Sequence, residues 1–169
     1  MCERRVDEVP TALLRAAKTG DVEKLRRLLR NEGAHKNVST LLYIAALYGH
    51  EEVVALLLEA GADKDKLTWD GTQSPPATPL FIAAQAGHKA AVARLLEAGA
   101  DKDKEDESGD TPLIIAAMNG HEPVVARLLE AGADKDKARP NGVTPLFMAA
   151  QKGHEPVVAR LLEAGADKD

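Results

Sequence analysis

Apolar residues recur along the chain at helical spacing, in short runs separated by polar stretches. Leu113, Ala116 and Ala117 fall at i, i+3 and i+4, so they share one face of a short helix. Thr111 and Pro112 come directly before this run. Threonine is a favoured N-cap residue, and proline at the first helical position gives up no hydrogen bond. The pattern therefore predicts a helix that starts at this pair.

A second helix is expected to follow after one tight turn. It would begin around His121 and Glu122, with Pro123 tolerated in its first turn. Its apolar residues form one stripe, made of Val124, Val125, Leu128 and Leu129. Gly132 then provides the positive φ that commonly ends a helix. The polar, glycine-containing segment "DKDKEDESGD" is typical of a projecting turn.

This arrangement repeats along almost the whole chain. "TPL" starts at Thr78, Thr111 and Thr144, at intervals of 33 residues, and degenerate copies start at Thr40 and Thr11. The sequence thus divides into five units, residues 11–39, 40–77, 78–110, 111–143 and 144–169. Segments 122–136 and 155–169 are identical, which favours recent duplication or a consensus-based engineered protein. The irregular first two units favour natural evolution, and both origins stay open.

Composition narrows the class of protein. Aromatic residues make up 3% of the chain against 44% hydrophobic residues, so the interior must be built of Ala, Val, Leu and Ile. A net charge of −5 makes nucleic acid a poor general partner. No apolar run approaches the roughly 18 residues of a membrane span. Cys2 is the sole cysteine, and no secretory signal is evident, so the cytoplasm or nucleus is expected.

One helix pair cannot bury its own apolar stripe, but stacked pairs can. The joint pattern "TPLxxAAxxGH…VVxxLL…GAD" resembles the ankyrin-repeat family over nearly the whole chain. The resemblance implies an all-α solenoid of five helix-turn-helix units with projecting turns. It also shows a departure, because apolar residues replace the family's usual histidine after "TPL". These residues are Tyr43, Phe81, Ile114 and Phe147. We expect them to place apolar bulk at the unit junctions.

Neither metal binding nor catalysis is expected. The histidines of the "GH" positions are His50, His88, His121 and His154. Units pack roughly 8–10 Å apart, too far for two of these rings to share a zinc ion. We expect them to form hydrogen bonds between units. A calcium loop starting at Asp101 would need Gly and Glu where Asp106 and Pro112 stand. No nucleophile or phosphate-loop motif occurs, so the chain is predicted to be no enzyme and to hold no cofactor.

The positions at which the units differ are the candidates for recognition. In ankyrin-like proteins, the turn tips and the surface of the first helices line one concave face that contacts partner proteins. By this resemblance the partner-binding residues are Tyr43, Leu47, Tyr48, Trp69, Asp70, Thr72, Gln85, Ala86, Glu107, Ser108, Asp110, Met118, Asn119, Pro140, Asn141, Val143, Gln151 and Lys152. The predicted function is non-catalytic protein binding through that face.

The turn of the second unit is five residues longer than the others and carries the single tryptophan, Trp69. Pro75 and Pro76 would stiffen it. Tryptophan is enriched at binding hot spots, which favours an aromatic anchor formed with Tyr48 and Leu47, to which Tyr43 could add its ring. The alternative is that Trp69 packs onto its own loop, and the sequence leaves both open.

The two ends of the array differ. The first unit carries Asp21, Arg26, Arg27 and Arg30 on its second helix, as a polar capping unit should. The last unit is an ordinary copy, so the stripe that contains Val158 and Leu162 is expected to be poorly covered. This favours truncation of a longer array or self-association through that end. Two alternative functions stay open. The chain could be a purely structural array, or a fragment of an enzyme whose catalytic domain lies elsewhere.

Overall fold

The computed structural model describes residues 9–30, 35–69 and 75–167. Within these ranges the chain forms ten α-helices and a short 3-10 helix, and its extended pairing is limited to one isolated bridge between Thr68 and Ala77. Consecutive helices pair, and each pair packs against the next one. The predicted all-α repeat solenoid is confirmed.

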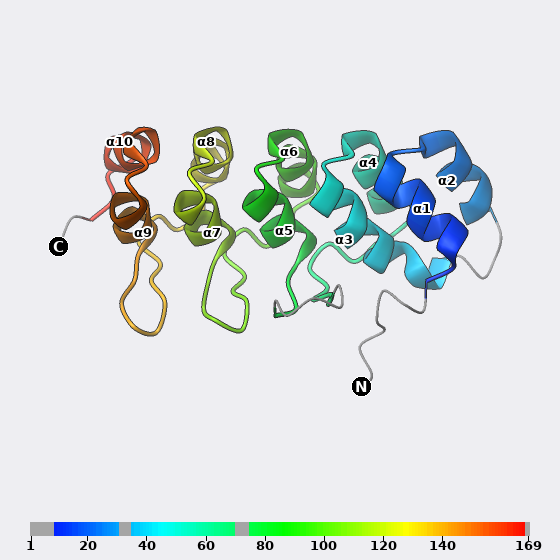
Figure 1. The fold of residues 1–169 in the computed structure, drawn as a ribbon, viewed down its shortest axis with the longest axis horizontal. Coiled ribbons are helices and arrows are strands. Elements are labelled where there is room, and N and C mark those ends of the chain that lie inside the picture. The colour runs from blue at the N-terminus through cyan, green and yellow to red at the C-terminus, as the bar shows by residue number, and fades with distance from the viewer. Residues whose placement is uncertain (1–8, 31–34, 70–74, 168–169) are drawn as a thin grey trace.

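The helices form two rows (Figure 1). The first helices of the pairs are α1 (Thr11–Thr19), α3 (Val38–Tyr48), α5 (Pro79–Ala86), α7 (Pro112–Met118) and α9 (Pro145–Lys152). The second helices are α2 (Val22–Leu29), α4 (Glu51–Glu59), α6 (Lys89–Glu97), α8 (Glu122–Glu130) and α10 (Glu155–Glu163). The 3-10 helix, His35–Asn37, leads into α3. Long turns project from the edge of the first-helix row, and the α1–α2 and α9–α10 pairs lie at opposite ends.

Three first helices begin at the predicted threonine–proline pair. The Oγ1 of Thr111 accepts the backbone N–H of Ile114 at 3.2 Å, and Thr78 and Thr144 cap α5 and α9 in the same way. Helix α3 begins earlier than the repeat pattern suggests. Its first residue is Val38, so Thr40 lies buried inside the helix and does not cap it.

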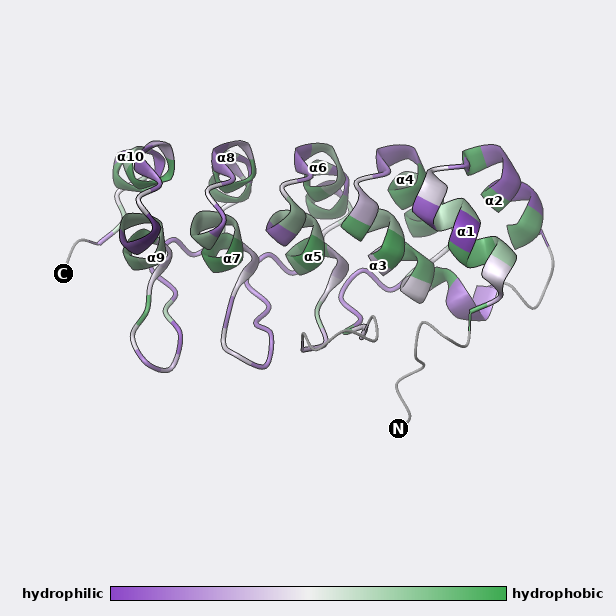
Figure 2. Ribbon diagram, viewed as in Figure 1, coloured by the Kyte–Doolittle hydropathy of each residue, from purple (hydrophilic) through white to green (hydrophobic). Residues whose placement is uncertain are grey.

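The core lies between the two rows, where Figure 2 shows the hydrophobic residues gathered, while the projecting turns are mostly polar. Small residues let the first helices approach each other. The fully buried alanines of these helices include Ala45, Ala46, Ala83, Ala84, Ala116 and Ala117. Tyr43, Phe81 and Ile114 are buried, so they supply the apolar bulk expected at the unit junctions. Phe147, the equivalent residue of α9, is 52% exposed because no further helix pair covers it.

Candidate partner-binding face

The projecting turns are closed at their bases by backbone hydrogen bonds. Thr68 and Ala77 exchange two of them, at 2.9 and 3.1 Å. The shorter turns close in a similar manner, with a bond across residues 106–110 at 3.0 Å and one across 139–143 at 2.9 Å. Short closed turns leave few backbone conformations, so the tips of the turns at 106–110 and 139–143 are held in fixed positions relative to the helices.

Carboxylates tie each turn to the next. The second aspartate of a "DKD" segment accepts the backbone N–H of the first aspartate in the following unit. The pairs are Asp65–Asp101 at 2.8 Å, Asp103–Asp134 at 2.9 Å and Asp136–Asp167 at 2.8 Å. The last of these bonds is the main cause of the lowered pKa of Asp136. The sequence predicted only an exposed charged face here. The sequence signal for this ladder is the repetition of Asp at i and i+2 in each of the last four units.

Charged side chains join the last two turns more tightly. The guanidinium of Arg139 donates to both carboxylate oxygens of Asp110, with Nη2 2.6 Å from Oδ2. This pairing raises the pKa of Arg139. Lys137 donates to the carbonyl of Asp103 at 2.8 Å and pairs with Glu105 at 2.9 Å. The hydrogen bond with Glu105 is the main cause of the raised pKa of Lys137.

The "GH" histidines form the hydrogen bonds that the sequence predicts. The Nε2 of His121 lies 3.0 Å from the carbonyl oxygen of Gln85 in the preceding unit. The other pairs are His50 with Lys18 at 2.9 Å, His88 with Leu47 at 3.0 Å and His154 with Met118 at 3.0 Å. Each ring thus links its own helix pair to the carboxyl end of the preceding first helix. The prediction of a structural histidine ladder is confirmed.

Two neighbouring turns and the helices beneath them enclose a pocket of about 190 Å³. Its floor comes from three adjacent first helices, α3, α5 and α7, and its walls from the turns before α5 and α7. The lining residues are Tyr43, Pro75, Ala77, Phe81, Ile82, Gln85, Asp106, Ser108, Asp110 and Ile115. The pocket therefore opens on the side of the molecule where turn tips and first helices meet.

The comparison with protein families agrees with this geometry. A family model of ankyrin repeats, described as three copies, matches residues 2–68 and 80–169. The chain is an ankyrin-repeat protein. No match was found among curated proteins. Ankyrin repeats are generally protein–protein interaction modules and generally non-enzymatic. The division into five units stays a prediction.

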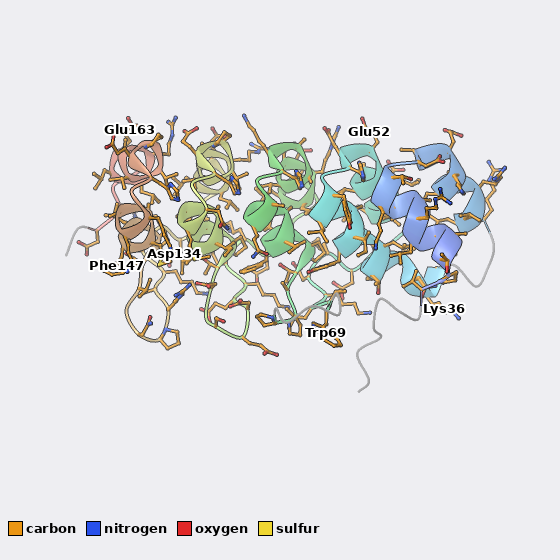
Figure 3. All side chains as sticks on the ribbon, in the orientation of Figure 1. Lys36, Glu52, Trp69, Asp134, Phe147 and Glu163 are labelled. Atoms are coloured by element: carbon orange, nitrogen blue, oxygen red, sulfur yellow. The ribbon has the colours of Figure 1, made fainter. Side chains whose placement is uncertain are left out.

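The predicted recognition residues of this ankyrin-repeat protein fall into four groups. Exposed are Tyr48, Glu107, Ser108, Asn119, Pro140, Asn141, Gln151 and Lys152. Half-buried are Leu47, Trp69, Gln85, Ala86, Met118 and Val143, and buried are Tyr43 and Asp110. Asp70 and Thr72 lie outside the described residues. Trp69 lies along the same edge as the other turns (Figure 3). Tyr48 ends α3, where the chain passes to α4, and its ring stacks on His50 at a centroid distance of 6.4 Å.

Two of the predicted residues have a structural role that the sequence did not reveal. Tyr43 is 2% exposed, and its ring contributes to the pocket floor. Asp110 is 6% exposed, and Arg139 occupies both of its carboxylate oxygens. That Asp110 contacts a partner stays a prediction, and its charge is already paired within the turn layer.

Several pocket residues are not among those predicted from the sequence, above all Ile82, Ile115 and Asp106. The first two belong to the common helix pattern, so comparing the units with each other could not single them out. Within the described ranges, no group of three or more His, Cys, Asp or Glu residues could hold a metal ion. None of the helices described is long and apolar enough to cross a membrane.

Proposed function

We propose that this chain is a non-catalytic protein-binding module whose partner lies along the face formed by the turn tips and first helices. The observation that carries the proposal is the pocket between two turns, because it gives that face a recess with an apolar floor. Turns joined by hydrogen bonds need little further ordering, which reduces the entropy cost of association. A specific interface would cover about 800 Å² of this face.

The test is quantitative capture of binding proteins from a cell lysate by the whole chain. A Tyr48→Ala/Trp69→Ala double variant removes two large side chains of the proposed face, and we expect it to retain less of the partner. The matched control is Glu52→Ala, at an exposed residue of α4 in the other row. Equal capture by the double variant and the wild type would overturn the proposal.

The role of Trp69 has two competing accounts, contact with the partner and packing onto its own turn. Trp69→Ala separates them when affinity for the captured partner and unfolding by urea are both measured. Truncation of a contact residue lowers affinity, on the order of 2 kcal/mol at a hot spot, and leaves stability nearly unchanged. Unchanged affinity with lowered stability assigns the side chain to loop packing.

Self-association is a second candidate function, favoured by the end of the stack. A depression of about 610 Å³ there is lined by Phe147, Val158 and Leu162 among others. Leu162 is 38% exposed, and Phe147 projects at this end in Figure 3. Light scattering over a range of concentrations tests it, with Phe147→Ser as the variant that should weaken association. A wild-type chain that stays monomeric at high concentration would rule out this function.

The cysteine content favours a reducing compartment. Because Cys2 is the sole cysteine, the chain has no internal disulfide and suits a reducing environment. We therefore place the protein in the cytoplasm or nucleus, which imaging of a fluorescent fusion of the full-length gene product would check.

A further inference from the structure

The pocket between the turns has a floor that the core holds in place. Tyr43, Phe81, Ile82 and Ile115 contribute to it, and each is no more than 8% exposed. They belong to three packed helices, so the floor is formed before any ligand arrives. Sites that enclose a drug-sized molecule measure about 300–1,000 Å³. At about 190 Å³ this pocket suits one side chain of a larger partner.

The wall formed by the later turn is strongly acidic. Residues 101–110 contain six carboxylates and two lysines. Glu105 is paired with Lys137, and Asp110 with Arg139. Asp106 lines the pocket, and one of its oxygens accepts the backbone N–H groups of Ser108 and Asp110, both at 2.9 Å. Asp106 also contributes, by its charge, to the raised pKa of Arg139, but no direct ion pair to Asp106 occurs among the described residues.

The turns before α7 and α9 are joined by an ion pair that has no equivalent between the turns before α5 and α7 among the described residues. Arg139 stands in its turn where Asp106 stands in the preceding one, since each backbone N–H bonds to the carbonyl four residues later. From there Arg139 reaches back to Asp110. Between the turns before α5 and α7, Asp106 takes the position of Arg139, and Ala77 takes the position of Asp110. A cation and an anion meet in one gap, whereas the equivalent residues of the other gap, a carboxylate and an alanine, form no ion pair within the described residues.

We propose that this pocket binds an extended segment of a partner protein in which a Leu, Ile or Met neighbours an Arg or Lys. The aliphatic side chain enters the pocket over Phe81 and Ile82. The neighbouring cation pairs with the carboxylate of Asp106, which forms no direct ion pair within the described residues. This inference rests on the proposed function and adds to it the chemistry of the partner.

The experiment uses three mixtures of immobilised peptides of equal length, randomised except for one central pair. The pair is Leu-Arg in the first mixture, Leu-Glu in the second and Leu-Gln in the third. Binding of the whole chain is measured by interferometry at low and high salt. We expect roughly two- to five-fold more binding to the Leu-Arg mixture than to the Leu-Glu mixture, as for other solvent-accessible ion pairs. The preference should shrink at high salt.

Asp106→Asn is the decisive variant. It keeps an oxygen for the N–H groups of Ser108 and Asp110, so the turn is retained and only the charge is lost. The preference for Leu-Arg should disappear, while binding to the Leu-Gln mixture stays. Asp134→Asn is the matched control, because Asp134 also caps a turn, through the N–H of Asp136 at 3.0 Å, but lies outside the pocket. The control should leave the preference unchanged.

A second variant tests the aliphatic part without disturbing the core. The Gln85 side chain is half-buried at the pocket edge, and the bond from His121 uses its backbone oxygen. Gln85→Trp narrows the pocket and should lower binding to all three mixtures.

Three results would overturn the inference, namely no binding to any mixture, equal binding to the Leu-Arg and Leu-Glu mixtures, or a preference that survives Asp106→Asn. The broader proposed function would still stand if the Tyr48→Ala/Trp69→Ala variant lost the captured partner. Unchanged capture by that variant would reject both.

Discussion

At the scale of single residues, the junction between units depends on a glycine that meets a histidine. Gly87 has a φ of +78° at the end of α5, in the left-handed region that side chains disfavour. A Cβ built on it would lie 2.8 Å from the ring of His121. The same ring bonds to the carbonyl of Gln85. Glycine is therefore required here both for backbone conformation and for the space that the ring occupies.

Gly87→Ala separates these two requirements when it is compared with Gly61→Ala. Gly61 has a similar φ of +81°, but nothing lies within 4 Å of the place that an alanine Cβ would take there. Both substitutions should cost about 1–2 kcal/mol for the backbone. Gly87→Ala should cost at least about 1 kcal/mol more, because the His121 ring must move and its hydrogen bond is weakened. Urea unfolding measures the difference, and equal losses would show that the ring adjusts freely.

A second residue-scale prediction concerns Asp136. The backbone N–H of Asp167 is the main cause that lowers the pKa of this carboxyl below its ordinary 3.8. Because the folded value is lower than the unfolded one, the stabilisation is present above about pH 4 and is lost as the pH falls through the folded pKa. Carbon NMR of the Asp136 carboxyl should give a titration midpoint below 3.8. A midpoint at or above that ordinary value would mean that the bond is not maintained in solution.

At the scale of elements, local chemistry was predictable and contacts between turns were not. Thr111 followed by Pro112 specifies a helix start within a few residues, so the caps of three helices could be predicted. The pairing of Arg139 with Asp110 depends on how far apart two successive turns lie, which no single unit encodes. Positions that differ between units are predicted to be recognition sites, yet one of them, Asp110, is paired with Arg139. The pocket could not be predicted from the sequence, because its floor consists of core residues that fit the common helix pattern.

The pair between Arg139 and Asp110 should stabilise the turn layer more than an exposed pair does. Its side chains are 21% and 8% exposed, whereas those of Arg94 and Glu51 are 48% and 36% exposed. Arg139→Met leaves the Asp110 carboxylate poorly solvated without its cation, which should cost about 1–2 kcal/mol. Arg94→Met should cost less than about 1 kcal/mol.

A double-mutant cycle decides whether that cost comes from the pair itself. Adding Asp110→Ala to Arg139→Met removes the stranded carboxylate and should recover part of the lost stability in urea unfolding. If the two single losses simply add, the interaction contributes little, and the turns are held mainly by their backbone bonds.

At the scale of the whole molecule, stability should depend on how many neighbours a helix pair has. Each interior pair is covered on both sides, whereas the α9–α10 pair is covered on one. The chain contains its own control, because α8 and α10 have the same sequence, "EPVVARLLE". Val125 is fully buried in α8, while its equivalent in α10, Val158, is only half-buried. Packing alone distinguishes the two helices.

Amide hydrogen exchange should therefore be faster in α10 than in α8. Identical sequences have nearly identical intrinsic exchange rates, so any difference in protection reports the free energy of local opening. In a stacked array that energy is the sum of each unit's own stability and its interfaces with neighbours, and α10 lacks one interface. The measurement is made at low protein concentration, where association through Phe147 and Leu162 is minimal.

Raising the concentration then separates two causes of protection in α10. Protection that grows with concentration means that a second copy covers the end, whereas equal protection of both helices at every concentration would contradict the nearest-neighbour account of this fold.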